Sequence, residues 1–385
     1  MGWDRQPPPV VVSPAPVVLG RWVVAAGAAG LSCVLLFLLS ASGRVPQLQG
    51  LNIWALTASP MLAWVLVFAA RAYFYGRALE DQQFLEEETL VVQQSWQDWA
   101  QRHLAVIDSC VLLPDQVSAS TLVQERASWS PRPGLARRIA TLPLLPEGRA
   151  GAGVRLLFPA VAPALQALPP GQELQVTLLS DIDPQHHEAL RDDWQQAWAS
   201  ALPSPPAALT LISELSYQWI DEKLKSANPA FELILVLQVQ GGAGYSDGLA
   251  ALLLCPDQLA RAHQLSVRGG LLRPMPLDIN ALDSELPLFL HTQACARQAT
   301  GLLTDSTRWQ ALTGQVITAS ATQGASLEVE QQWTQELFCG LPGPFSSWLM
   351  AALGVEVARH QQRPLVLLTE EASRQWIATT VGEQV

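Results

Sequence analysis

The residues FELILVLQVQGGAGYSDGLAALLLC (231–255) decide the fold of this chain of 385 residues. They contain two strongly apolar runs, 231–239 and 248–255, joined by a glycine-rich turn. Short apolar runs between turn residues are typical of strands that are buried on both faces of a sheet. We therefore expect two neighbouring core strands here.

Segments with strand and helix patterns alternate on both sides of this pair. Further strands are expected at 104–113, 173–179, 208–212, 316–321 and 364–369, and helices at 156–168, 184–201, 216–226 and 346–361. Prolines and polar residues predict long loops at 114–153 and 272–290. Alternation of this kind predicts an α/β domain with a parallel or mixed sheet.

Two apolar segments precede this domain. WVVAAGAAGLSCVLLFLL (22–39) and IWALTASPMLAWVLVFAA (53–70) each contain 18 residues and no charge. A helix rises about 1.5 Å per residue and the hydrocarbon core of a bilayer is about 30 Å thick, so each segment can just span it. The link at 40–52 is too short to be a domain. The pattern predicts a two-helix transmembrane hairpin over 17–77.

Arginines indicate how this hairpin is oriented. Arg5 and Arg21 precede the first span, Arg71 and Arg77 follow the second, and the link carries only Arg44. Positive charge resists translocation, so both termini and the large domain are expected in the cytoplasm of a bacterial cell, with a multi-pass anchor in the inner membrane. A signal peptide is the alternative for the first span, but the long proline-rich lead and the immediate second span disfavour it.

The flanks of the hairpin have different patterns. Residues 1–16 are proline-rich and without periodicity, and are expected to be disordered. Residues 78–103 carry apolar and acidic side chains at helical spacing, which predicts an amphipathic connecting helix before a domain at 104–385. Either its apolar stripe packs on the domain, or Trp96 and Trp99 form part of a surface that binds a partner.

Composition excludes several classes of protein. The net charge is −11 and the only lysines are Lys223 and Lys225, so nucleic acid is not an expected partner. The cysteines form no CxxC pair, which favours reduced thiols over a disulfide framework or a zinc site. They are Cys33, Cys110, Cys255, Cys295 and Cys339.

No motif in the domain indicates a metal or cofactor site. His186 and His187 follow two aspartates, but neighbouring helical positions point about 100° apart, so a solvated helix start is favoured over a metal site. The aspartates are Asp181 and Asp183. The turn GGAG (241–244) leads into a strand and lacks the spacing of a phosphate-binding loop.

Nucleophilic catalysis is not indicated either. No GxSxG motif occurs, and four further histidines have ordinary surroundings, namely His103, His263, His291 and His360. Asp221 and Glu222, next to Lys223, are expected on an exposed helix face. Most of eight tryptophans are expected in the core, and these are Trp96, Trp99, Trp194, Trp198, Trp219, Trp309, Trp333 and Trp348.

The order of these elements resembles thiolase-like proteins, and within them the ketosynthase branch. The similarity covers roughly 104–380. It rests on HLAVIDSCVLLP (103–114), on the strand pair at 231–255 and on CGLPGPFSSWLMAALGVEVARHQQRPLVLL (339–368). The resemblance implies a layered α/β fold with mixed sheets.

The catalytic residues of that family have no counterparts in this chain. Ketosynthases carry a nucleophilic cysteine at the start of the helix after the third core strand, and TLISELSYQWIDEKL (210–224) contains none. Two assisting histidines are missing from CGLPGPFSS (339–347) and TDSTRW (304–309), and Cys339 has no basic residue near it in sequence. The resemblance implies an inactive member, with no catalytic, cofactor or metal residues.

The chain is also similar in style to accessory proteins of bacterial type VI secretion clusters, among them the lipase adapters. On this resemblance it is an inner-membrane adapter that binds a secreted effector or a spike component. One alternative is a membrane-tethered acyltransferase or lipid-handling enzyme, in which Cys110, Cys255 or Cys339 faces a pocket beside a histidine. Another is a structural membrane subunit that interacts through the hairpin.

Overall fold

The computed structural model describes residues 3, 13–42, 52–124, 133–227, 229–325, 327–372 and 374–383. The chain divides into two compact units. One consists of Met1–Arg5 with Trp96–Val385, and the other of Gln6–Ser95. The first is called the globular unit below.

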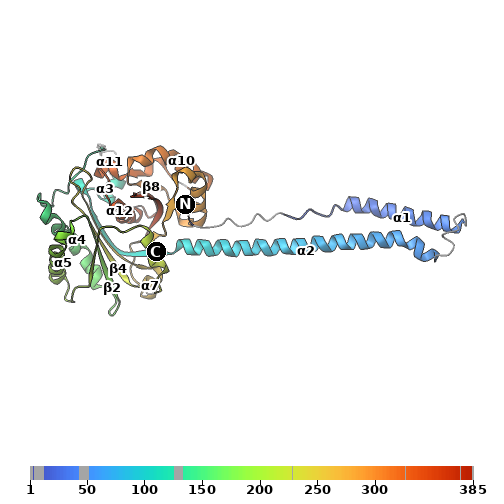
Figure 1. The fold of residues 1–385 in the computed structure, drawn as a ribbon, viewed down its shortest axis with the longest axis horizontal. Coiled ribbons are helices and arrows are strands. Elements are labelled where there is room, and N and C mark those ends of the chain that lie inside the picture. Colours follow the sequence, from blue (N-terminus) through green and yellow to red (C-terminus); the bar gives the residue numbers. More distant parts are fainter. Residues whose placement is uncertain are drawn as a thin grey trace. The chain divides into compact units, whose positions relative to one another are not determined.

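Two long helices contain the expected spans. α1 (Leu19–Ala41) and α2 (Ile53–Gln101) are both long and apolar enough to cross a membrane (Figure 1). α2 continues without a break through most of the connecting helix expected at 78–103. Of the expected link and of the expected disordered N-terminus, residues 43–51, 1–2 and 4–12 lie outside the described part of the chain.

The globular unit is built on one mixed sheet of 11 strands. The strands of its first half are β1 (His103–Leu112), β2 (Leu174–Ser180), β3 (Leu209–Ile212), β4 (Phe231–Gln238) and β5 (Gly248–Pro256). Those of its second half are β6 (Gly269–Leu272), β7 (Met275–Leu277), β8 (Gly301–Thr304), β9 (Gln332–Thr334), β10 (Leu365–Glu371) and β11 (Arg374–Gly382). Their order is β3-β2-β4-β5-β1-β6-β11-β10-β8-β9, with β7 beside β11.

The two halves of the sheet have the same topology. In the first half β3, β2 and β4 are parallel, β5 is antiparallel to β4, and β1 is antiparallel to β5. In the second half β9, β8 and β10 are parallel, β11 is antiparallel to β10, and β6 is antiparallel to β11. β1 and β6 pair antiparallel and join the halves. β4 and β5 of the first half thus correspond to β10 and β11 of the second, on either side of the β1–β6 pair.

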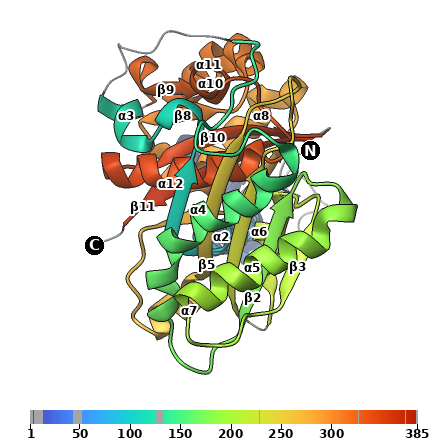
Figure 2. The same cartoon turned by 90° about the vertical axis from the view of Figure 1, so that its left-hand side faces the viewer.

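Helices separate and cover the two halves. The helices of the first half are α3 (Ala119–Gln124), α4 (Arg149–Gln166), α5 (His187–Ala201), α6 (Gln218–Lys225) and α7 (Asp257–Ala262). Those of the second are α8 (Leu282–Thr292), α9 (Ala294–Arg297), α10 (Gln310–Thr322), α11 (Gln335–Cys339) and α12 (Ser346–Gln361). Figure 2 shows α4 and α5 lying over the first half, with α8 and α10 at the opposite side of the unit.

The alternation of side chains along the strands defines five layers. Leu233 and Leu235 of β4 pack with α4 and α5, whereas Ile234 and Val236 face a central layer that contains α12. In β10, 365 and 367 face the same central layer, whereas 366 and 368 pack with α8 and α10. The order is helix, sheet, helix, sheet, helix, and it confirms the predicted layered α/β domain.

Most of the expected strands and helices are present, but three segments were predicted wrongly. The loop expected at 114–153 contains α3 and the first residues of α4. The expected loop at 272–290 contains β7 and most of α8, because its buried side chains, including Leu282, Leu286 and Phe289, recur at helical spacing. The expected strand at 316–321 lies in α10, where Val316 and Ser320 are four residues apart and share the buried face.

The expected helix at 156–168 begins earlier, at Arg149. Glycines in its first turns have a low helix propensity, so no helix was expected there. Packing against neighbouring side chains nevertheless requires glycine at these positions. A Cβ at Gly151 would lie 1.9 Å from the Asp193 carboxylate, and one at Gly153 would lie 3.0 Å from Leu249. Most of the eight tryptophans lie in the core as expected, because Trp194, Trp198, Trp309, Trp333 and Trp348 are buried.

Candidate functional site

The starts of α6 and α12 meet the ends of strands from the opposite half of the sheet. The backbone N–H of Tyr217, just before α6, donates to Glu371 at the end of β10, at 2.9 Å to Oε1 and 3.1 Å to Oε2. The N–H of Phe345, just before α12, donates to Gln238 Oε1 at the end of β4, at 3.0 Å. The repeated topology thus places a polar strand end at each helix start.

Glu371 is the most highly coordinated side chain of this region. Besides the Tyr217 N–H, it accepts the Ser216 hydroxyl at 3.1 Å, the Ser347 hydroxyl at 2.8 Å and the Trp376 indole N–H at 2.9 Å. Helix N-termini and hydroxyl donors are the groups that stabilise anions in proteins. The Glu371 carboxylate therefore fills the anion position at the start of α6.

A cavity of about 460 Å³ opens beside Glu371. Its described lining residues are Ser213, Glu214, Leu215, Ser216, Gln218, Pro344, Glu371, Ala372 and Arg374. This set contains neither cysteine nor histidine. The start of α6, which follows the third strand of the first half, is where the family resemblance implies a nucleophile, and here it carries Ser216 and Tyr217.

Tyr217 lies behind the site, in the core. Its ring packs edge-on against Trp348, with centroids 5.6 Å apart. Within the described residues its hydroxyl has no hydrogen-bond partner. Burial raises the pKa of this phenol, and the negative charges of Glu371 and Asp305 add to the rise. Tyr217 therefore stays neutral and contributes packing.

Asp305 occupies the TDSTRW loop, where the resemblance led us to look for a histidine. Its carboxylate accepts the N–H of Glu370 at 2.7 Å and the indole N–H of Trp309 at 2.8 Å. Burial raises the pKa of Asp305 to about 6, although these two donors oppose the rise. Asp305 holds the end of β10, and with it Glu371, against the loop.

The Asp305→Asn variant should change how stability depends on pH. The carboxyl has an ordinary pKa of 3.8 and a pKa of about 6 in the folded chain, so between these values the folded state keeps a proton that the unfolded state has lost. Stability contributed by this group is therefore present below pH 4 and lost as the pH rises through 6, by about 3 kcal/mol at 1.36 kcal/mol per pKa unit. Urea unfolding at pH 4 to 7 measures the difference between wild type and variant, which should fall by that amount. A difference that is constant over this range would contradict the assignment.

The cysteines of the globular unit are not activated. Burial raises the pKa of Cys110 and of Cys295, raises that of Cys255 to about 12, and raises that of the fully buried Cys339. The thiolate is the nucleophilic form of cysteine. None of these four thiols is poised for acyl transfer near neutral pH.

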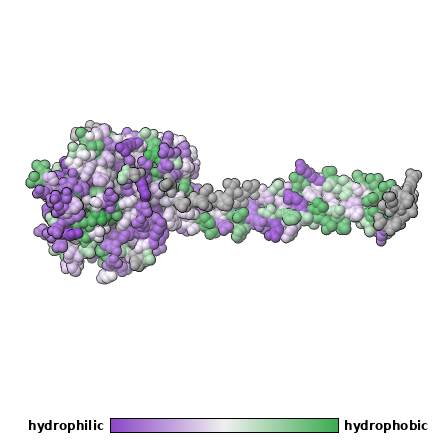
Figure 3. All heavy atoms as spheres, in the orientation of Figure 1, coloured by the Kyte–Doolittle hydropathy of each residue, from purple (hydrophilic) through white to green (hydrophobic). Residues whose placement is uncertain are grey.

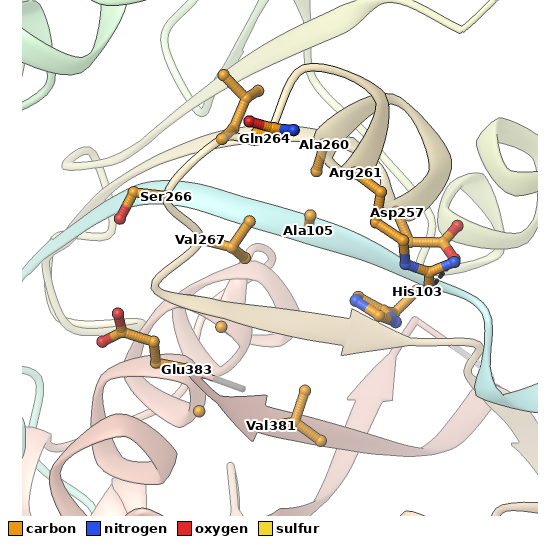
Figure 4. A pocket seen from close by; sticks show the side chains of 13 residues that line it. His103, Ala105, Asp257, Ala260, Arg261, Gln264, Ser266, Val267, Val381 and Glu383 are labelled. Carbon is orange, nitrogen blue, oxygen red and sulfur yellow. Dashed lines mark ion pairs between the residues drawn. The ribbon is translucent and has the colours of Figure 1, made fainter. Parts of the chain in front are cut away.

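A second cavity, of about 440 Å³, lies where β1 and β6 begin and β5 and β11 end (Figure 4). His103 and the Arg261–Asp257 ion pair, at 2.8 Å, gather at one end of it, and Glu383 and Ser266 lie at the other. Burial lowers the pKa of His103, so the imidazole is neutral near pH 7. Asp257 is also paired with Arg102 at 3.2 Å. The ionic groups at the histidine end are thus paired with each other.

The histidine pair predicted to be a solvated helix start lies at the beginning of α5. Asp183 caps the preceding turn by accepting the Gln185 N–H at 3.1 Å. Asp181 accepts the N–H groups of Val239 and Gln240 instead, at 2.8 and 2.7 Å. Within the described residues no group of three or more His, Cys, Asp or Glu side chains could hold a metal ion.

Two further expectations meet different outcomes. The GGAG segment forms a tight turn, in which the Gly244 N–H donates to the Gly241 carbonyl at 2.8 Å and Gly242 has a φ of 58°. Asp221, expected on an exposed helix face, instead pairs with the buried Arg273. Arg273 also stacks on Trp99, with its guanidinium carbon 4.5 Å from the ring centroid. Because a buried cation needs a counter-charge, Asp221 is drawn into this pair.

Sequence reasoning missed Glu371. The only signal was a pair of acids directly after the apolar run LVLLT (365–369). Such a pair is typical of a strand end that is exposed to solvent. The Trp376 donor is five residues away and the Ser347 donor 24, but the donors at 216–217 are 155 and 154 residues away in sequence. The pairing depends on the repeated topology.

Comparison with known proteins supports the fold. No protein-family model matches the chain, and no curated protein matches it. Among solved structures, a chain from a complex of a type II polyketide synthase acyl-carrier protein with its hexaketide-bound ketosynthase is 10% identical, with a TM-score of 0.51 over 73% of this chain and 99% of that one. The ishigamide ketosynthase/chain length factor is 12% identical, with a TM-score of 0.49 over 74% of this chain and all (100%) of that one. The fold is thiolase-like, as the sequence resemblance implied.

Proposed function

We propose that this protein is a membrane-anchored, non-catalytic adapter whose thiolase-like domain binds another protein. The observation that carries this proposal is the Glu371 carboxylate, which occupies the donors at the start of α6. Acyl transfer needs such donors free, because they stabilise the oxyanion that develops in the transition state. A carboxylate in this position would compete with a substrate oxyanion for the same donors.

The thiols support the same conclusion. Condensing acyl chains requires a nucleophile activated by a lowered pKa or by an adjacent base. The raised pKa values of Cys110, Cys255, Cys295 and Cys339 work in the opposite direction. A protein-binding role makes no such demand on the domain.

Trp3 supports the proposed membrane topology. Its ring lies 5.4 Å from that of Trp99 and 5.7 Å from that of Phe289, and its indole N–H donates to the Pro274 carbonyl at 3.1 Å. Residue 3 can reach these partners only if it lies on the same side of the membrane as the globular unit. This contact supports a chain that crosses the bilayer an even number of times between residue 3 and the globular unit, as the proposed hairpin does.

Labelling of single cysteines checks this topology. In a chain whose native cysteines are replaced by serine, Ser13→Cys and Glu222→Cys should be protected from a membrane-impermeant maleimide in intact spheroplasts, and Ser42→Cys should be labelled. All three positions are exposed in the structure, so disruption of the membrane should make all three reactive. Opposite labelling of positions 13 and 222 in intact spheroplasts would contradict the hairpin.

We further propose that the partner is a secreted effector or a spike component of a type VI secretion system, held at the bacterial inner membrane before export. A partner of this kind would be recovered with the protein when it is purified from its native host in mild detergent.

A membrane-tethered acyltransferase or lipid-handling enzyme is the competing proposal. One observation favours it, since His103 and Cys295 line the same cavity of about 340 Å³. Incubating the purified full-length protein with acyl-coenzyme A and measuring its intact mass separates the two proposals. The adapter proposal expects no acyl adduct on wild type or on Cys295→Ser. An adduct on wild type that Cys295→Ser abolishes would establish the enzyme.

A further inference from the structure

The segment of α2 at 79–95 carries an exposed apolar stripe. Phe84 and Val91 are 65% and 64% exposed, and Leu85 and Val92 are 40% and 46% exposed. The two pairs are spaced by seven residues, which places all four side chains on one side of a helix. Figure 3 shows hydrophobic and strongly hydrophilic side chains together along this part of the helix.

The segment also contains five acids, together with the exposed Leu79 and Leu90. Glu80, Asp81, Glu86, Glu87 and Glu88 lie in it, and no lysine or arginine occurs between Arg77 and Arg102. At 100° per residue, Asp81 and Glu88 lie on the same side of the helix as these apolar side chains, and Glu80 and Glu87 lie beside them. A helix face that combines apolar side chains with charges of one sign favours a partner helix of the opposite sign.

Lipid and a second copy of the chain are poor occupants of this surface. Val91 comes 20 residues after Arg71, which marks the end of the proposed span. At 1.5 Å per residue this places Val91 about 30 Å beyond the hydrocarbon core, which is itself about 30 Å thick, so lipid tails do not reach it. Anionic lipid headgroups would repel the carboxylates. A second copy in parallel would bring the same five acids against each other.

We propose that the stripe of Phe84, Leu85, Val91 and Val92 binds an amphipathic helix of a partner protein whose flanking positions are rich in lysine and arginine. This inference rests on the proposed adapter function and names where and how the partner is recognised. The apolar side chains would supply the contact area, and the acids would select the sign of the partner's charge.

Site-specific photocrosslinking tests the inference in the native host. A benzophenone amino acid in place of Val91 should crosslink to a partner peptide, and the same group in place of Gln83, on the opposite side of the helix, is the matched control. Digestion and mass spectrometry identify the crosslinked peptide. It should have apolar residues at helical spacing and at least two lysines or arginines beside them.

Two variants separate the apolar and the charged contributions. Phe84→Gln with Val91→Gln keeps good helix formers and should reduce recovery of the partner with the full-length protein about tenfold or more, which corresponds to about 1.4 kcal/mol. Glu87→Lys with Glu88→Lys should reduce it similarly through charge repulsion. Glu80→Gln, which leaves the stripe and four acids in place, should have little effect.

The outcomes distinguish this inference from the proposed function. A partner that is recovered unchanged from the stripe variants overturns the inference but leaves the adapter function in place. Crosslinks only to another copy of the chain or to lipid overturn it as well. Failure to recover any partner with wild type overturns the proposed function itself.

Discussion

The Glu371→Ala variant is expected to lose about 2–4 kcal/mol of unfolding free energy. Removing the carboxylate leaves the Tyr217 N–H, the hydroxyls of Ser216 and Ser347 and the Trp376 indole N–H without their acceptor. Hydrogen bonds to a charged group contribute about 1.5–3 kcal/mol each and do not add fully, and unpaired buried donors carry a desolvation cost. Urea unfolding of the full-length protein in detergent, followed by tryptophan fluorescence, measures the loss.

The neighbouring acid supplies the control. Glu370 pairs with Arg308 at 3.3 Å, and the Arg308 side chain is 80% exposed. A surface ion pair contributes at most about 1 kcal/mol, so Glu370→Ala should unfold close to wild type. Similar losses in the two variants would show that Glu371 is an ordinary strand-end acid.

A small carboxylate should rescue Glu371→Ala. The variant leaves a set of converging donors beside a cavity of about 460 Å³, which is large enough to admit formate or acetate. Formate at the same ionic strength as a chloride reference should raise the melting temperature of the variant by several degrees and leave wild type unchanged. Equal shifts in both proteins, or in neither, would contradict an anion position at the start of α6.

The Trp348→Ala variant should cost about 3–5 kcal/mol, the usual range for removing a buried aromatic side chain. Trp348 is fully buried in α12, in the central layer between the two halves of the sheet. Its ring contacts those of Tyr217 and Trp219, with centroids 5.6 and 5.7 Å away, and its indole N–H donates to the Leu215 carbonyl at 2.7 Å. Its loss opens a cavity directly behind the start of α6.

Two further variants place this loss. Trp348→Phe keeps most of the packing and loses the hydrogen bond, so its cost should lie between wild type and alanine. Trp219→Ala removes a partly exposed ring from the same cluster and should cost less than Trp348→Ala. Denaturant midpoints rank the three variants, and a Trp348→Ala midpoint close to wild type would show that the central layer does not carry the fold.

The strands that are buried over their whole length could be predicted from the sequence. The apolar runs of β4 and β5 are buried over their whole length, so composition alone identified them as strands. The segments that were predicted wrongly have local features that tertiary packing overrides. β-branched residues at 316–318 indicated a strand, yet the spacing of Val316 and Ser320 fits the helix that packs there.

The candidate site was not predictable in the same way. The absence of a cysteine at 210–224 and of histidines at 304–309 and 339–347 was visible in the sequence. What replaces the catalytic groups was not, because Glu371 lies 154 residues from the Tyr217 N–H that it accepts. The same holds for Arg273, whose partner Asp221 is 52 residues away and looked like a solvated acid.

Native mass spectrometry of the affinity-purified full-length protein, in mild detergent from its native host, tests the central claim most directly. The chain should carry its unmodified sequence mass and be bound to a partner protein in a fixed ratio. Recovery of the chain without any partner, or with an acyl group covalently attached, would contradict a non-catalytic adapter.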